Sequence, residues 1–138
     1  MKPSAFVDTN IILDLLMNRV PFVTEAAQLF AKAYYGDVRL YVSALSFANA
    51  HYQLHKNIDF RHQATDLLRR FEPLVTTLAF DVKIIRLGFQ SDFKDFEDGL
   101  QYLTCIKNKI PVLLTRNLSD FKMATIPVMT AGDFLKTL

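Results

Sequence analysis

The sequence predicts an α/β domain with a mostly parallel central sheet. Short apolar runs of strand length recur along the chain, and segments with helical spacing of apolar residues lie between them. No linker, internal repeat or low-complexity tract interrupts this alternation. Strands that alternate with helices pair in parallel, with the helices packed on the faces of the sheet. We therefore expect a single domain over residues 1–138, a length that buries a sizeable core.

The first half of the chain supplies two of the expected strands. Asp8 ends the first apolar run, and Ser43 is a suitable N-cap for the helix after the second. Pro21 suits the first turn of a helix, and Gly36 suits its end. The expected elements are strands over residues 5–7 and 38–42, with helices over residues 11–16, between Pro21 and Gly36, and after Ser43.

The second half continues the pattern around an acidic segment. Asp81 is placed to cap one helix, and the acidic run at residues 92–98 leads into another. The expected elements are helices over residues 60–71, 82–89, 99–107 and 131–138, and strands over residues 74–78, 112–114 and 128–129.

Composition indicates a globular protein of a reducing compartment. The chain is 51% hydrophobic and 22% charged, which argues against disorder. Its one cysteine, Cys105, cannot form a disulfide within the chain, so we expect no disulfide framework. The N-terminus carries no long apolar signal region, and no run of apolar residues is long enough to span a membrane. We expect a soluble, cytoplasmic protein without a membrane partner.

Charge is distributed unevenly along the chain. Sixteen basic residues against fourteen acidic ones give a net charge of +2, but four of the acidic residues lie within residues 92–98. An excess of basic residues outside a local cluster of acids is compatible with a phosphate-rich ligand held near bound cations. It is equally compatible with an ordinary solvated surface.

Polar residues follow three of the expected strands. They are Asp8 with Thr9 and Asn10, then Ser43, and then Thr115 with Arg116 and Asn117. In open parallel sheets, ligands bind beyond the carboxyl ends of the strands, so these residues are expected at one edge. Asp95 and Asp98 share one face at the start of a helix, and Asp120 follows the last cluster. We expect Asp8, Asp95, Asp98 and Asp120 to form an acidic centre.

Crowded carboxylates repel one another, which raises their pKa values, and a divalent cation relieves that cost. Mg²⁺ and Mn²⁺ prefer oxygen ligands and are commonly held by a few carboxylates together with a substrate phosphate. The acidic centre therefore favours metal-assisted hydrolysis of a phosphodiester bond.

Each acid also has a structural interpretation. Asp8 is placed to cap the following helix, and Asp95 with Asp98 resembles an N-cap and its partner at the third helical position. Asp14 lies within an apolar helix as a supporting or surface acid, and Glu97 is expected to point away from Asp98 into solvent. A capping role and a ligand role are compatible.

Three segments resemble the motifs of one family, the PIN domains. Residues 6–16 (FVDTNIILDLL) resemble the family's opening motif, residues 95–101 (DFEDGLQ) its central acidic motif, and residues 114–121 (LTRNLSDF) its closing motif. All three occur in the family's order and cover nearly the whole chain, which makes the resemblance specific.

The resemblance implies a three-layer α/β/α sandwich and cleavage of RNA that depends on Mg²⁺ or Mn²⁺. Many small bacterial members are toxins of the VapC type, dimeric and silenced by an antitoxin protein, so the resemblance also implies a homodimer and an antitoxin partner. On this analogy Asp8 and Asp98 are the principal metal ligands, and Asp95 and Asp120 complete the catalytic centre.

Supporting roles follow from the same analogy. Thr115 and Asn117 would orient metal-bound water or a phosphate, with Asn10 near them, and Arg116 would contact the RNA backbone, which a guanidinium group suits well.

One position departs from the family pattern. Many active members carry a glutamate in the helix after the second strand, where this chain has Asn49. An amide oxygen can bind a metal ion but lacks the charge of a carboxylate. We expect Asn49 to face the pocket, with weaker metal binding or greater reliance on Asp95.

Three functions from different classes are compatible with these features. The first is a metal-dependent endoribonuclease, the toxin of a type II toxin–antitoxin pair. The second, which Asn49 favours, is a catalytically weakened PIN-fold module that binds RNA or a protein. The third is a phosphotransfer domain, but Asp8 lacks the second acid two places later that haloacid-dehalogenase-like phosphatases use.

Overall fold

The central sheet is entirely parallel, as the sequence predicts. The computed structural model describes residues 2–138, and Met1, where the expected domain begins, lies outside them. The strands are ordered β3-β2-β1-β4-β5, and every neighbouring pair is parallel. Their bounds are β1 Ser4–Val7, β2 Arg39–Ser43, β3 Thr76–Leu78, β4 Leu113–Leu114 and β5 Val128–Met129.

The strand order places a topological switch point between β1 and β4. The chain leaves β1 for β2 and β3 at one edge, then crosses back to β4 and β5 on the other side of β1. In such sheets the connections diverge from two central strands and leave a crevice beyond their carboxyl ends. The residues that follow β1 and β4 therefore line this crevice.

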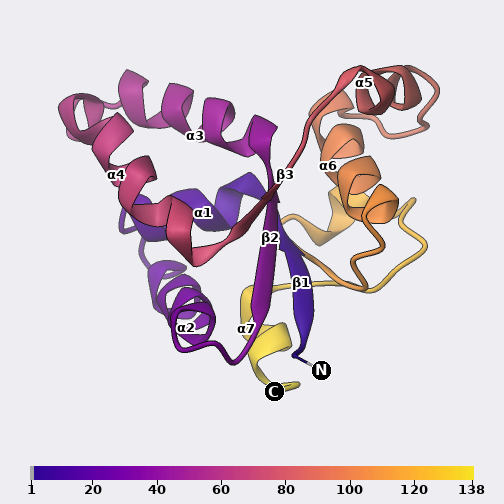
Figure 1. Cartoon of the computed structure of the whole chain (residues 1–138). Helices are drawn as coiled ribbons and strands as arrows, with labels where there is room; N and C mark the ends of the chain where they lie inside the picture. The colour runs from indigo at the N-terminus through magenta and orange to yellow at the C-terminus, as the bar shows by residue number, and fades with distance from the viewer. Residues whose placement is uncertain (1) are drawn as a thin grey trace.

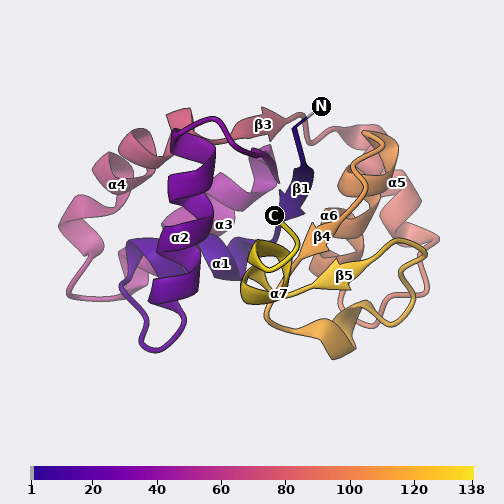
Figure 2. The ribbon, with the colours of Figure 1, turned by 90° about the horizontal axis from the view of Figure 1, so that it is seen from below.

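Helices cover both faces of the sheet, which gives the expected α/β/α sandwich (Figures 1 and 2). On the face to which Ala5 and Val7 point, the core includes side chains of α1, α2 and α7, and Phe6 points to the opposite face, where Cys105 of α6 packs. The helices are α1 Thr9–Leu16, α2 Val23–Tyr34, α3 Ala44–Lys56, α4 Ala64–Phe71, α5 Val82–Phe89, α6 Phe96–Lys107 and α7 Ala131–Leu135. Within residues 2–138, no helix has the length and apolar character needed to cross a membrane.

Several predicted boundaries hold, and others shift for local reasons. Gly36 adopts a φ of 81°, a conformation that glycine accepts readily, just after α2 ends. The helix expected over residues 60–71 instead starts with a 3-10 turn at Arg61–Gln63. A second 3-10 turn, Glu72–Leu74, contains Pro73, which has no N–H to continue a helix, and it delays β3. The last helix ends at Leu135, and the Thr137 hydroxyl donates to the carbonyl of Phe134.

Candidate active site

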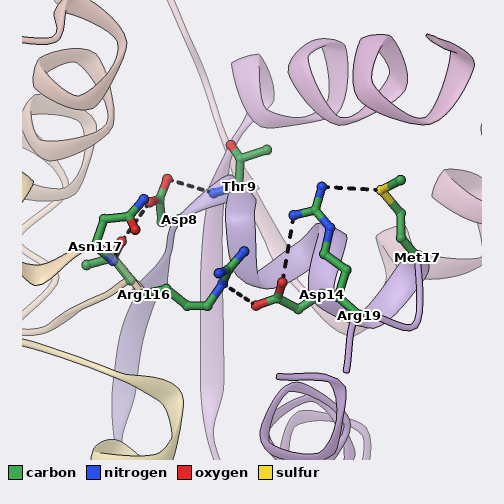
Figure 3. A network of polar contacts seen from close by, with 8 residues as sticks. Asp8, Thr9, Asp14, Met17, Arg19, Arg116 and Asn117 are labelled. Carbon is green, nitrogen blue, oxygen red and sulfur yellow. Dashed lines mark hydrogen bonds and ion pairs between the residues drawn. The ribbon is translucent and has the colours of Figure 1, made fainter. Parts of the chain in front are cut away.

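Asp8 lies at the end of β1, inside the crevice between β1 and β4. Its side chain is only 5% exposed. The Thr115 hydroxyl, which follows β4, donates to Asp8 Oδ2 at 2.8 Å, and the backbone N–H of Thr9 donates to Oδ1 at 2.8 Å. Figure 3 shows Asp8 fixed between these two segments. Asp8 therefore caps α1, as its structural interpretation predicts, and also joins the two strands at the switch point.

The electrostatic surroundings of Asp8 disfavour its charged form. Burial raises the pKa of Asp8 to about 6, and the hydrogen bonds from Thr115 and Thr9 only partly offset that effect. The nearby charges that act on it, those of Glu97 and Asp120, are negative and raise the pKa further. A buried carboxylate in this position favours a cation.

Asp95 and Asp98 form the predicted cap at the start of α6. The backbone N–H of Asp98 donates to Asp95 Oδ1 at 3.0 Å. Burial raises the pKa of Asp98 to about 7, and the charges of Asp8, Asp95, Asp120 and Glu97 raise it in that order. The other three expected acids thus lie within electrostatic reach of Asp98.

Asp98 stands between two cavities. The first, which we call the Asp8 cleft, has a volume of about 380 Å³. The second, the Asp120 cleft, has a volume of about 350 Å³ and is lined by Asp95, Asp98 and Asp120 among others. The Asp8 cleft is lined by Asp8, Thr9, Asn10, Leu13, Arg19, Asn49, Tyr52, Gln53, Glu97 and Asp98. The four expected acids are thus divided between adjacent cavities that share Asp98.

The donor set suits a hard divalent cation, although its side chains are spread apart. Among residues 2–138, no three acidic, histidine or cysteine side chains stand close enough together to hold one ion. Carboxylate and amide oxygens are nevertheless the ligands that Mg²⁺ and Mn²⁺ prefer. Asp8 and Asp98 share one cleft, and the charge of Asp8 raises the pKa of Asp98, a repulsion of the kind that a cation relieves.

Asn49 faces the Asp8 cleft, as expected. It lies on α3, which a buried chain of hydrogen bonds ties to α1 and α6. The Thr9 hydroxyl donates to Ser46 Oγ at 3.1 Å, and Gln101 Nε2 donates to the same oxygen at 3.2 Å. The side-chain nitrogen of Asn49 is buried and has no hydrogen-bond partner within the described chain. An unsatisfied donor in this position suits an oxygen-rich ligand.

Six residues that line the Asp8 cleft were not among the expected site residues, and two of them, Glu97 and Arg19, are charged. Glu97 lines the cleft with Asp8 and is also exposed, as expected for an acid that points into solvent. Burial raises its pKa, and the charge of Asp95 adds to the effect. Arg19, which follows α1, also lines the cleft. The helical spacing of Glu97 from Gln101 was the available signal for the first, whereas Arg19 depends on the path of a loop.

Arg116 lines neither cleft and is paired within the chain, and its expected contact with RNA stays a prediction. Its Nε lies 2.9 Å from Oδ2 of Asp14, whose side chain is 2% exposed. Its guanidinium group also lies 4.0 Å from the centre of the Phe22 ring. Arg19 approaches the same carboxylate at 3.8 Å, so Asp14 sits between two cations (Figure 3). Arg116 therefore holds the loop after β4 against α1.

The other supporting residues serve the framework around Asp8. Thr115 is fully buried, and its hydroxyl also accepts from the backbone N–H of Asn117 at 3.1 Å. Ser43 caps α3 by accepting from the backbone N–H of Leu45 at 3.1 Å. Thr115 thus orients the Asp8 carboxylate directly.

Comparisons with known proteins agree with this geometry. A family model described as PIN domain matches residues 4–119. The chain is similar in structure to a toxin–antitoxin complex from Klebsiella pneumoniae, with a TM-score of 0.66, 24% identity, and coverage of 92% of this chain and 97% of that chain. Compared with curated protein sequences, the chain shows no match.

Two further solved structures share the fold. FitAcB from Neisseria gonorrhoeae has a TM-score of 0.68 and 19% identity, and the match covers 93% of this chain and 98% of that chain. VapC20 from Mycobacterium tuberculosis, described as a toxin that cleaves the sarcin–ricin loop, has a TM-score of 0.68 and 14% identity, with coverage of 89% and 98%. At these identities the likeness establishes the fold.

Proposed function

The chain belongs to the PIN-domain family, and from this premise we propose that its single domain, residues 1–138, is a metal-dependent endoribonuclease. The observation that carries the proposal is the presence of Asp8 and Asp98 in one cleft, where burial and the charges of neighbouring acids raise both pKa values. Perturbed carboxylates that converge in a cavity are typical of catalytic sites.

The residues of the cleft would have different roles in phosphodiester hydrolysis. A bound Mg²⁺ or Mn²⁺ would supply Lewis-acid activation of water and stabilisation of developing negative charge. Asp8 and Asp98 would hold the ion, with Asp95 and Asp120 on the second side of Asp98. Thr115 and the N–H of Thr9 fix the Asp8 carboxylate, so little side-chain ordering is needed when the ion binds.

The Asp8 cleft also offers groups that suit RNA. Arg19 lines the cleft and also pairs with Asp14 at 3.8 Å, and its guanidinium group would bind a phosphate of the substrate from this position. Tyr52 lines the same cleft and is 64% exposed, so its ring is available to stack on an unpaired base. Asn10 adds a polar side chain to this rim.

The toxin role is the finer part of the proposal. The Klebsiella pneumoniae neighbour is a toxin–antitoxin complex, and VapC20 is described as an RNA-loop-cleaving toxin. By analogy, we propose that this chain is the toxin of a type II pair, acts as a homodimer and is silenced by an antitoxin protein. Fold-level analogy alone supports this part.

The ribonuclease proposal is tested with purified protein, structured and single-stranded RNA, and Mn²⁺ or EDTA. Cleavage is expected with Mn²⁺, and EDTA or Asp98→Asn should abolish it. Asp59→Asn, which changes an exposed acid outside both clefts, should cleave like the wild type. Cleavage that survives Asp98→Asn would overturn the assignment.

Asn49 favours a second candidate function, a weakened module that binds RNA or a protein without cutting. The neutral amide removes one negative charge from the cleft relative to the family pattern. In the same assay, this candidate predicts retention of RNA with no products at any Mn²⁺ concentration.

A further inference from the structure

We propose that Glu97 supplies the metal-binding carboxylate that is missing at position 49, so that the acid enters the Asp8 cleft from α6 and not from α3. This inference rests on the proposed metal site. The inference assigns a metal-binding role to Glu97, a residue that was expected to point into solvent.

The packing of α3 against α6 brings the two positions to one place. Gln101 Nε2 donates to Ser46 Oγ at 3.2 Å, and both side chains are buried. Asn49 lies one turn after Ser46, and Glu97 lies one turn before Gln101. Residues one turn apart share a helix face, so the faces that meet at Ser46 and Gln101 continue to Asn49 and Glu97. Both residues line the Asp8 cleft.

The charge of Glu97 acts on the proposed metal-binding acids, and no ion pair within the described chain neutralises it. Its carboxylate is among the charges that act on both Asp8 and Asp98. No lysine, arginine or histidine among residues 2–138 forms an ion pair with it. Arg19, the cation of the same cleft, pairs with Asp14. Glu97 is therefore an exposed acid that lines the cleft and has no counter-ion within the described chain.

Asn49 complements this arrangement as a neutral residue. Its buried side-chain nitrogen lacks a hydrogen-bond partner, and an N–H donor is attracted to oxygen and not to a cation. A donor on α3 suits a carboxylate or phosphate oxygen inside the cleft. With Glu97, three carboxylates line the Asp8 cleft, those of Asp8, Glu97 and Asp98, and their side chains would have to draw together to hold one ion.

The test is a swap of the acid between the two helices, with Mn²⁺ affinity measured by calorimetry on the full chain without RNA. Glu97→Gln should weaken Mn²⁺ binding by at least about tenfold, in the range expected for loss of a group that supports a metal site. Asn49→Glu introduced into Glu97→Gln should restore most of the affinity. Glu72→Gln, a change to an exposed acid outside both clefts, is the control and should bind like the wild type.

Two results would overturn the inference. One is a Glu97→Gln protein that binds Mn²⁺ as tightly as the wild type. The other is a double variant that stays as weak as Glu97→Gln although circular dichroism and melting show it to be folded.

The failure of this inference is distinguishable from the failure of the proposed ribonuclease. If RNA is cut and Glu97→Gln binds Mn²⁺ normally, only the role of Glu97 is wrong. If the swap behaves as expected but no RNA is cut, Glu97 stands as a metal-binding residue and the ribonuclease proposal fails. A wild-type protein that binds no Mn²⁺ overturns the inference.

Discussion

Asp8 and Asp14 lie in the same N-terminal segment and are both buried, at 5% and 2% exposure. The charged side chains near them have opposite signs. Asp14 faces Arg116 at 2.9 Å and Arg19 at 3.8 Å. Asp8 accepts hydrogen bonds from Thr115 and Thr9, while the charges near it are those of acids. Burial raises the pKa of both carboxyl groups, and only that of Asp14 is opposed by cations.

The difference separates a structural acid from a functional one. A buried carboxylate that the chain neutralises with its own arginines joins one segment to another. A buried carboxylate that is hydrogen-bonded in place, yet surrounded by like charge, costs free energy unless a cation arrives from outside. We infer that Asp14 stabilises the fold and that Asp8 is kept for a ligand.

The largest expected effect is a loss of RNA cleavage when the charge of Asp8, the functional acid of the pair, is removed. Asp8→Asn keeps the shape of the side chain but removes its charge, so RNA cleavage with Mn²⁺ should fall by about a hundredfold to a thousandfold, the range seen when one preorganised electrostatic group is lost. Initial rates on a fluorescent RNA measure this. A rate within a factor of about two of the wild type would place Asp8 among the structural residues.

The same substitution at Asp14, the structural acid, should change the free energy of unfolding. Asp14→Asn leaves Arg116 and Arg19 without their counter-charge and should lower the free energy of unfolding by about 3 kcal/mol. Asp8→Asn should change it by less than about 1 kcal/mol or raise it, because it removes an uncompensated buried charge. Urea unfolding of the two variants tests the contrast, and equal losses would contradict it.

The pH dependence of stability should be opposite in sign to that of a paired carboxylate. The pKa of Asp98 is about 7 and that of Asp8 about 6, against an ordinary value of 3.8. The folded chain therefore holds these protons more tightly than the unfolded chain between about pH 4 and about pH 7, and stability from these groups is lost as the pH rises through that window.

Asp98→Asn provides the control for that prediction, since every other titrating group is retained. Without metal, the melting temperature of the wild type should fall relative to that of Asp98→Asn as the pH rises from about 4 to about 8. A constant difference between the two proteins would show that Asp98 titrates normally. With Mn²⁺ present, the wild type should gain stability toward the upper end of the window, because ion binding needs the charged carboxylates.

The smallest expected effect concerns the group that positions Asp8. Thr115→Val keeps the shape of a fully buried side chain but removes the hydroxyl that donates to Asp8. Stability should fall by about 1 kcal/mol, and cleavage should fall less than in Asp8→Asn. Urea unfolding and the cleavage assay together check this, and a larger loss of cleavage than in Asp8→Asn would reverse the assigned roles.

The sequence was sufficient for the fold and for the residues that follow the strands. Alternating apolar runs predicted the parallel sheet, and short-range capping rules predicted the contacts of Asp8, Ser43 and Asp95. These features depend on neighbouring residues, so a sequence displays them directly.

The partners across the fold could not be predicted in the same way. Arg116 follows a strand that ends at the site, but its side chain turns to Asp14, which lies about a hundred residues away in the chain. Glu97 enters the Asp8 cleft because α3 and α6 meet through Ser46 and Gln101. Both outcomes depend on long-range packing that no local pattern encodes.

The most direct test of the account is a calorimetric titration of Mn²⁺ into the metal-free wild type and into Asp98→Asn, at about pH 8, where the acids are charged. Asp98 lines both clefts, so its charge should matter most. The account predicts saturable binding to the wild type and its loss in the folded variant. Absence of binding to the wild type, or equal affinity in both proteins, would contradict the claim that these buried acids are held for a metal ion.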